Sequence, residues 1–395
     1  MRVVIVHNRY RSENLSGENR VVENDIERLR ADGVEVYPYI RDSDEIANWT
    51  AIGKASLAVR PLVSPSDALA FRRMLRRVRP DIVHLHNPFP IISPWIVRTA
   101  KAQRIPLVQT VHNYRHVCVN GIHFRDGHLC TECVGKKFPW PAVQHGCYQG
   151  SRARSLPMAA AVTAHRSTWN LVDCFLPVGD AVADNLRELG IPDSRIEVRP
   201  NIVDDPGEPA SLGEGVLFVG RLSEEKGIRP LLEAWSTLDI AGNHRLSIAG
   251  DGDLRDEVEA AALSDPSIRY LGFLSKAELD GEYRRCAIVV GPSLCPEADG
   301  LSIVTALSHG RPVVASDLGS MPAILGDDAG WIVAPGGASL SAGLRVAMSD
   351  RAEQERRGVA ARKRFSETRS SATRSSLFST YSSVAAAAAA RDRNQ

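Results

Sequence analysis

Short runs of apolar, mostly β-branched residues alternate with longer segments of helical spacing along the whole chain. In Glu18–Ala31, for example, Val21, Val22, Ile26 and Leu29 recur at the spacing of one helical face, and Gly33 follows as a helix stop. This alternation is typical of βαβ units around a parallel sheet. In the first half it predicts buried strands at Val3–Val6, Val34–Tyr37, Ile82–Leu85, Leu107–Val111, Cys174–Val178 and Ile196–Val198.

The alternation breaks once and then restarts. Residues 203–214 have no periodicity and are rich in Pro, Gly and acidic residues, which is typical of an interdomain linker. A second doubly wound sheet is expected from strands at Val216–Val219, Leu246–Ala249, Ala287–Val290 and Val313–Ala315, with helices near Ile228–Leu238, Leu254–Leu263, Lys276–Arg285 and Leu301–Ser308.

The pattern therefore predicts two domains, at 1–204 and 205–365, and a separate C-terminal helix in 366–395. In that helix Leu377, Phe378 and Tyr381 are expected on one apolar face, which packs back on the first domain. A length of 395 residues fits two cores better than one.

Composition narrows the class of protein. The formal net charge is +1 and 24% of residues are charged, which argues against a dedicated nucleic-acid binder. The N-terminal MRVVIVHNRY is typical of a buried strand. It does not resemble a signal peptide, because it lacks the long h-region and the small-residue cleavage site. No apolar run approaches the roughly 20 residues that span a bilayer. We expect a cytoplasmic protein, with the inner face of the plasma membrane as an option.

The stretch PSLCPEADGLSIVTALSHGRPVVAS at 292–316 carries the first candidate chemistry. A strand ends before it, a loop carries Glu297 and Gly300, and a helix begins near Leu301. Ligands of open α/β sheets bind where strands end in such loops. The free amides of Gly300, Leu301 and Ser302 at a helix start would attract a phosphate. The alternative is an ordinary βαβ crossover.

The second candidate is VGRLSEEKG at 219–227. Arg221 and Lys226 follow a buried strand, so both would project from its carboxyl end. A guanidinium and an ammonium placed there suit a diphosphate. A solvated turn neutralised by Glu224 and Glu225 is the alternative.

Taken together, these stretches resemble the large family of retaining glycosyltransferases called family 4, or glycosyl transferases group 1, which have the two-domain GT-B architecture. The resemblance covers nearly the whole chain, and the order of the motifs makes it specific. Besides the two stretches above, the motifs are the strand-to-glycine loop from Asn8 to Gly17, TVHN at 110–113, PNIVD at 200–204, AGDGDL at 249–254 and RYLGF at 269–273.

The resemblance implies an α/β fold of two Rossmann-like domains facing across a cleft, and transfer of a hexosyl unit from a UDP- or GDP-linked sugar. The acceptor would be a glycan, a lipid-linked sugar or a small glycoside, and the anomeric configuration would be retained. Rival interpretations are a sugar-nucleotide epimerase of the same architecture, which needs no acceptor, and a non-catalytic relative that only binds the nucleotide sugar.

The resemblance also implies roles for residues. Arg221 and Lys226 would hold the donor diphosphate, Glu297 would contact the transferred sugar, and His112 would lie beside that sugar. Without the resemblance, a structural role at the strand end is the better interpretation of His112, and His84 and His86 are taken as structural or acceptor-side residues. The implied donor-binding set is Gly17, Gly220, Arg221, Lys226, Gly250, Leu271 (within the base-binding segment 269–274), Glu297, Gly300, Leu301, Ser302 and Thr305.

Thr305 departs from the family pattern. The second acid of the family's E-x7-E motif, which binds the ribose hydroxyls, should stand at this position. A threonine hydroxyl can make one such bond but no charge-assisted pair. This departure motivates the non-catalytic alternative. No D-x-D pattern provides a metal clamp, so no catalytic metal is expected, and Arg221 and Lys226 would stabilise the leaving diphosphate instead.

Residues 118–147 contain a Cys130–Cys133 pair with knuckle spacing, flanked by Cys118 and Cys147. Four thiolates suit a tetrahedral structural zinc, in an insertion at 114–150 that would shape acceptor recognition. His123, His128 and His145 are competing ligands, and four reduced cysteines in a loop are the alternative.

Arg72–Arg79 (RRMLRRVR) interleaves arginines with apolar residues, as an amphipathic basic helix does. Such a run is usually a solvated face. The other interpretation is peripheral contact with an anionic membrane that carries the acceptor.

Overall fold

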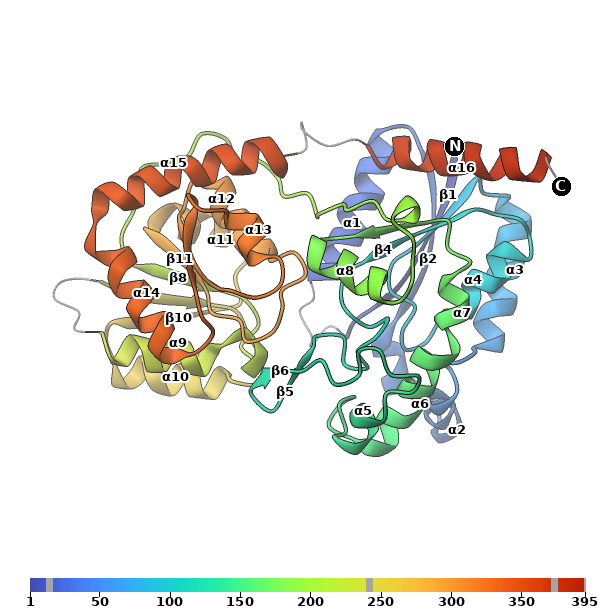
Figure 1. The fold of residues 1–395 in the computed structure, drawn as a ribbon, viewed down its shortest axis with the longest axis horizontal. Helices are drawn as coiled ribbons and strands as arrows, with labels where there is room; N and C mark the ends of the chain where they lie inside the picture. The colour runs from blue at the N-terminus through green and yellow to red at the C-terminus, as the bar shows by residue number, and fades with distance from the viewer. Residues whose placement is uncertain (12–16, 239–243, 371–375, 394–395) are drawn as a thin grey trace. The chain divides into compact units, whose positions relative to one another are not determined.

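The computed structural model describes residues 1–11, 17–238, 244–370 and 376–393. The chain divides into two compact units (Figure 1). The first comprises Met1–His123, Thr131–Pro200 and Ser375–Gln395, and the second comprises Phe124–Cys130 and Asn201–Arg374.

A five-stranded sheet of order β2-β1-β3-β4-β7 forms the centre of the first unit. All of its neighbouring strands are parallel, and Val3 of β1 lies opposite Val36 of β2 and Ile82 of β3. The apolar side chains of β1, β3, β4 and β7 are almost fully buried, as expected for strands covered on both faces, whereas the edge strand β2 has no buried residue. The strands are β1 (Arg2–Arg9), β2 (Glu35–Asp42), β3 (Ile82–Leu85), β4 (Leu107–Val111) and β7 (Cys174–Pro177).

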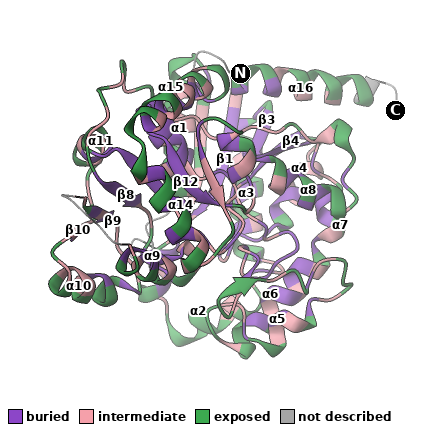
Figure 2. Cartoon of the chain, turned by 60° about the vertical axis from the view of Figure 1, so that its left-hand side comes forward, coloured by how far each residue is buried: buried purple, intermediate pink, exposed green. Residues whose placement is uncertain are grey.

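Helices cover this sheet, and they include the last one of the chain. Leu377 and Tyr381 of α16 join Val22 and Leu29 of α1 in one apolar cluster with strand residues. In both Figure 1 and Figure 2 the N-terminus lies beside α16. The helices of this unit are α1 (Gly17–Ala31), α2 (Ala51–Ala55), α3 (Pro65–Val78), α4 (Trp95–Lys101), α5 (Trp140–Gln144), α6 (Arg152–Ala164), α7 (Arg166–Trp169), α8 (Asp180–Glu188) and α16 (Leu377–Arg393).

A six-stranded parallel sheet of order β10-β9-β8-β11-β12-β13 forms the second unit. Because β9 and β10 extend from one side of β8 and β11 begins on its other side, the winding reverses between β8 and β11. The strands are β8 (Val216–Val219), β9 (Leu246–Ala249), β10 (Ile268–Gly272), β11 (Ile288–Gly291), β12 (Val313–Ser316) and β13 (Gly330–Val333).

Two apolar clusters, one containing Trp235 and the other Tyr283 and Phe365, bury the two faces of this sheet. Helix α11 begins with a capping box in which Ser275 and Glu278 satisfy each other's backbone amides. The helices are α9 (Ile228–Ser236), α10 (Arg255–Ser264), α11 (Lys276–Arg285), α12 (Leu301–Ser308), α13 (Met321–Leu325), α14 (Gly337–Ser349) and α15 (Arg351–Thr368).

Three expectations need correction. Ile196–Val198 is not a strand, because only Ile196 bridges to Phe175. The segment after residue 365 does not begin a separate helix, since α15 continues to Thr368 in the second unit and α16 starts at Leu377. Phe378 is 43% exposed, while Leu377 and Tyr381 are buried.

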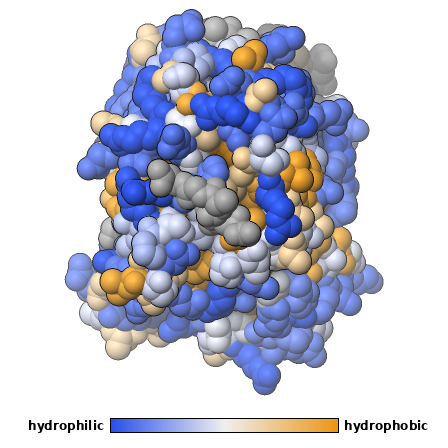
Figure 3. All heavy atoms as spheres, turned by 90° about the vertical axis from the view of Figure 1, so that its left-hand side faces the viewer, coloured by the Kyte–Doolittle hydropathy of each residue, from blue (hydrophilic) through white to orange (hydrophobic). Residues whose placement is uncertain are grey.

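The surface is mostly polar. Figure 2 shows central strands such as β1, β3 and β8 buried and the outward faces of the helices exposed. On the face that Figure 3 shows, apolar side chains are scattered among hydrophilic ones, as on ordinary protein surfaces. Among the helices of the described residues, none has the length and apolar character that crossing a membrane requires.

Candidate functional site

The donor-type residues predicted from the sequence gather at one edge of the second sheet. Gly220 and Arg221 follow β8, Gly250 follows β9 and Leu271 lies near the end of β10. The loop after β11 carries Glu297 and leads into α12. Because the strands are parallel, their carboxyl ends meet at this edge, where open α/β sheets bind ligands.

An ion pair bridges the loops after β8 and β11, where the winding of the sheet reverses. The Lys226 ammonium donates to Glu297 Oε1 at 2.5 Å, and Ser293 Oγ donates to the same oxygen at 2.5 Å. Burial alone would raise the pKa of Glu297, but Lys226, Ser293 and Arg221 together hold it below its usual value. Burial opposes the charge of Lys226 as well, yet Glu297 keeps the pKa of Lys226 above its usual value. The pair is therefore charged on both sides.

Gly227 makes this bridge possible. Its φ is +73°, and a Cβ added there would lie 1.9 Å from the Pro292 carbonyl oxygen. A side chain at this position would push the two loops apart. Gly227 directly follows the 3-10 turn η4 (Glu224–Lys226) and caps it. The two loops are also joined by the Leu294 amide, which donates to the Glu225 carbonyl at 2.9 Å.

Arg221 lies beside the bridge with a partner of its own. Its guanidinium donates to Glu225 Oε1 at 2.5 Å, and its side chain is 40% exposed. Glu225 also accepts a hydrogen bond from Ser223. The exposed fraction leaves Arg221 accessible to an anion, in contrast to the more buried Lys226.

Helix α12 begins directly after the loop that carries Glu297. Gly300 adopts the left-handed conformation (φ 59°), and its carbonyl accepts from the amides of Ile303 and Val304. The first amides of a helix have no intrahelical acceptor, so those of Gly300, Leu301 and Ser302 are oriented to receive an anion. Asp299, buried just before them, accepts from the Asn201 amide and pairs with Arg369.

Thr305 lies one turn further along α12. Its hydroxyl donates to the Leu301 carbonyl at 2.8 Å, a bond within the helix. Such back-bonding satisfies the hydroxyl locally. Position 305 therefore offers a ligand no carboxylate, as the sequence indicated.

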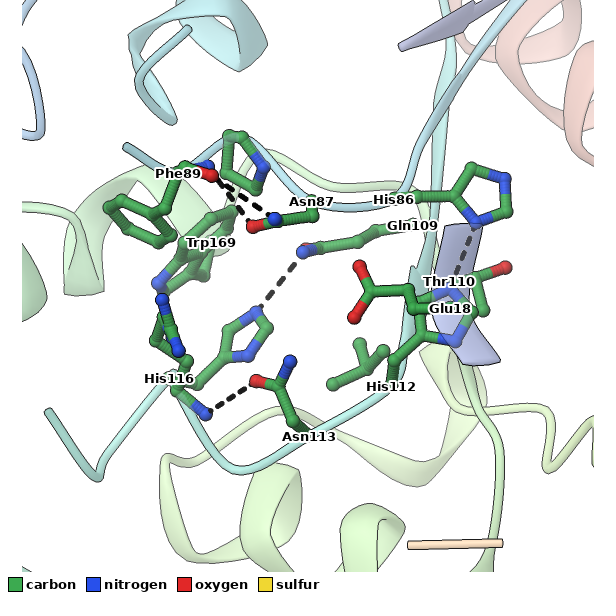
Figure 4. A pocket seen from close by; sticks show the side chains of 13 residues that line it. Glu18, His86, Asn87, Phe89, Gln109, Thr110, His112, Asn113, His116 and Trp169 are labelled. Carbon is green, nitrogen blue, oxygen red and sulfur yellow. Dashed lines mark hydrogen bonds between the residues drawn. The ribbon is translucent and has the colours of Figure 1, made fainter. Parts of the chain in front are cut away.

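A small polar pocket lies at the corresponding edge of the first sheet, where β3 and β4 end (Figure 4). His116 and Gln109 form a hydrogen bond on one side, and His86 and His112 form one on the other. Trp169 and Phe89 supply aromatic walls. Burial raises the pKa of Glu18, which lines the pocket, to about 7.

His112 belongs to a row of neighbouring histidines, of which His86 and His112 line this pocket. His86 Nδ1 and His112 Nε2 are 2.9 Å apart, and the two rings lie edge to edge with their planes 19° apart. His84 contacts His86, and its Nδ1 lies 2.6 Å from the Tyr381 hydroxyl of α16. Burial lowers the pKa of His84 and that of His112 to about 3, so both are neutral at neutral pH.

Two family descriptions match the chain. "Glycosyl transferase 4-like domain" matches residues 16–202, and "Glycosyl transferases group 1" matches residues 213–350. The chain belongs to the group 1, family 4-type glycosyltransferases. A phosphatidyl-myo-inositol mannosyltransferase of Mycobacterium leprae is 27% identical over 291 residues, which are 72% of this chain and 68% of the relative.

Solved structures agree on the architecture of this glycosyltransferase. A sucrose-phosphate synthase from Thermosynechococcus elongatus superposes with a TM-score of 0.68 at 16% identity, covering 100% of this chain and 98% of that one. The Anabaena protein HepE, solved in complex with UDP-glucose, gives a TM-score of 0.64 at 15% identity over 100% of both chains. The fold is GT-B, with two doubly wound Rossmann-like domains.

The structure of the glycosyltransferase groups the predicted residues in two places. The donor-type set of the second unit shares one sheet edge, whereas His112 and Gly17 lie in the first unit, Gly17 as the first residue of α1. Sequence reasoning missed the pocket residues Glu18, Asn87, Gln109 and His116. Polar residues at the ends of β3 and β4 were the available signal, and only the histidines among them were singled out.

The cysteine segment is divided between the units. The hairpin of β5 (Phe124–Arg125) and β6 (His128–Leu129) groups with the second unit, and its flanks group with the first. The Cys118 thiol donates to Asn120 Oδ1 at 2.8 Å. Within the residues that the structure describes, no three His, Cys, Asp or Glu side chains are arranged to hold a metal ion. The zinc site at Cys118, Cys130, Cys133 and Cys147 stays a prediction.

Proposed function

We propose that this glycosyltransferase transfers a hexosyl unit from a UDP- or GDP-linked sugar to a glycan, lipid-linked sugar or small glycoside, with retention of configuration. The observation that carries the proposal is the Lys226–Glu297 ion pair across the switch point of the second sheet, beside the start of α12. The HepE complex with UDP-glucose supports a nucleotide-sugar donor in this fold.

In this mechanism the protein stabilises charge that develops during bond cleavage. Breaking the sugar–phosphate bond places negative charge on the diphosphate, which Lys226, Arg221 and the first amides of α12 would receive. Groups already oriented for that charge favour the transition state over the ground state. Glu297, held in place by Lys226 and Ser293, would accept hydrogen bonds from hydroxyl groups of the transferred sugar.

Thermal-shift measurements with a panel of nucleotide sugars test the donor. A donor present at 100 times its Kd should stabilise the native protein by about 2.7 kcal/mol, because it binds only the folded state. We expect one UDP- or GDP-linked sugar to raise the Tm and to be consumed only when an acceptor is present. The anomeric signal of the product should match that of the donor. Consumption without an acceptor would instead indicate an epimerase, and an inverted product would contradict retention.

We also propose that the enzyme works in the cytoplasm at the inner face of the plasma membrane, held by α3 through anionic lipids. Arg72, Arg73, Arg76 and Arg77 are exposed on this helix, while Phe71 and Leu75 are buried beneath them. Neither these four nor Arg79 forms an ion pair with any acid of the described residues. Leu69, 48% exposed, shares their side of the helix. The name of the mycobacterial relative, a phosphatidyl-myo-inositol mannosyltransferase, supports a lipid acceptor at the membrane.

Vesicle flotation tests the membrane contact. Each arginine near an anionic surface contributes about 1 kcal/mol, so Arg73→Gln with Arg76→Gln should weaken binding to phosphatidylserine vesicles roughly 30-fold. The matched control replaces Arg255 and Arg356, which are 53% and 54% exposed but paired with Glu259 and Glu353. Equal binding of the two double variants, or equal binding to uncharged phosphatidylcholine vesicles, would contradict the contact.

A further inference from the structure

A buried ion pair lies directly before the start of α12. Asp299 precedes Gly300 in the loop after β11, and its carboxylate pairs with the guanidinium of Arg369. The two side chains are 4% and 9% exposed, and both residues belong to the second unit. Acidic and basic side chains are almost never buried to this extent unless they are paired. Each of the two charges therefore requires the other.

The Asp299 carboxylate bonds to the two segments by which the chain enters and leaves the second unit. Asn201 begins the long segment of that unit, and its amide donates to Asp299 Oδ2 at 3.1 Å. Arg369 directly follows α15, and its guanidinium donates to Asp299 Oδ1. Both carboxylate oxygens are thus bonded to segments outside the loop that carries Glu297.

Backbone contacts hold the preceding part of this loop. The Ser320 amide donates to the Glu297 carbonyl at 2.9 Å, and Ser320 Oγ donates to the Ala298 carbonyl at 2.7 Å. The Asp299 side chain extends this attachment to the residue before Gly300. A loop held in this way presents its amides to an anion without having to reorganise first.

The charge of Asp299 gives the pair a consequence for an anion. An unpaired carboxylate one residue before the free amides of α12 would repel a diphosphate, and like charges repel strongly where water is largely excluded. We propose that Arg369 is a positioning residue of the donor site, which neutralises Asp299 and holds the start of α12 in the conformation that receives the diphosphate. This inference rests on the proposed function, in which the donor diphosphate binds there. Arg369 itself need not touch the ligand.

Titration calorimetry of the full-length protein with UDP and GDP, and NMR titration with uridine and guanosine, test this role. Arg369→Gln leaves Asp299 unpaired, so the Kd of the diphosphate that binds should rise roughly tenfold, while that of its nucleoside should change less than about twofold. Adding Asp299→Asn removes the repelling charge and should return the diphosphate Kd to within about threefold of wild type. Arg369→Lys keeps the positive charge and should stay within the same range.

Arg362→Gln is the matched control. Arg362 lies on the same helix, pairs with Asp205 at 2.8 Å and donates to the carbonyl of Ser308, the last residue of α12. Its replacement should change neither Kd by more than about twofold, because it adds no unpaired charge at the start of α12.

An unchanged diphosphate Kd in Arg369→Gln, an equal loss for diphosphate and nucleoside, or no recovery with Asp299→Asn would overturn the inference. If the unfolding midpoint shows that Arg369→Gln does not fold, loss of diphosphate binding in both the lysine variant and the double variant overturns it instead. Failure of UDP and GDP to bind the wild-type protein would remove the proposed donor site itself, and this role of Arg369 with it.

Discussion

Replacing Lys226 with alanine is expected to lower kcat/KM for the nucleotide sugar by about 10²–10³, the range seen when one oriented group facing transition-state charge is removed. Lys226 would contact the diphosphate and also fixes Glu297 through the 2.5 Å ion pair. Without the ammonium, the burial of Glu297 is less opposed and its pKa should rise. The loss should appear in kcat as well as in KM, measured by steady-state kinetics.

Arg229→Ala is the matched control for this change. Arg229 lies in the same segment, but it is 52% exposed and pairs with Glu257, so less than a twofold change is expected. Glu297→Gln combined with Lys226→Ala should lose little more than Lys226→Ala alone, because the two residues act as one unit. Equal kinetics for Lys226→Ala and Arg229→Ala in folded proteins would contradict the proposed donor site.

The central strands of both sheets and the edge strands of the first sheet could be predicted from the sequence, whereas the edge strands of the second sheet could not. Ile82–Leu85 and Val216–Val219 form β-branched runs because both faces of these strands are covered. The edge strands β10 and β13 have few fully buried positions and contain glycines, so their pattern does not differ from that of a loop. In α16, Leu377 and Tyr381 are four residues apart on the buried face, and Phe378 points away from it.

The part of the candidate site that lies within short sequence motifs could be located from the sequence. Arg221, Lys226, Glu297 and Gly300 lie in two short motifs, and the parallel sheet brings the ends of β8 and β11 together. The histidine row could not be predicted in the same way. His84 and Tyr381 are separated by 297 positions, and their contact depends on how α16 packs. No local pattern identifies such a partner.

The linker could be recognised by its composition, but its attachment to the second unit could not. Residues 203–214 contain no helix or strand, yet their backbone is held by Arg311, which is fully buried. The Arg311 guanidinium donates to the carbonyls of Ala210 and Ser211 at 3.1 Å. It also donates to the carbonyls of Tyr283 and Arg284 at 2.8 and 3.2 Å, at the end of α11.

Arg311→Met is therefore expected to destabilise the second unit by about 3–5 kcal/mol, since the substitution leaves buried carbonyls of the linker and of α11 without a donor. Lysine should recover only part of the loss, because one ammonium cannot reach acceptors that the planar guanidinium serves from three nitrogens. Urea unfolding followed by circular dichroism measures the effect. Hydrogen exchange should become faster in residues 208–213 and in α11 before it does in the first unit.

Arg284→Met is the control for this substitution, since Arg284 is exposed and donates only to the Pro206 carbonyl among the bonds found in the described residues. Its unfolding midpoint should stay close to that of the wild type. An unchanged midpoint for Arg311→Met would mean that water replaces the guanidinium at these carbonyls. With the expected loss, activity should also fall, because Arg311 fixes the end of α11, from which the chain enters β11 and the loop that carries Glu297.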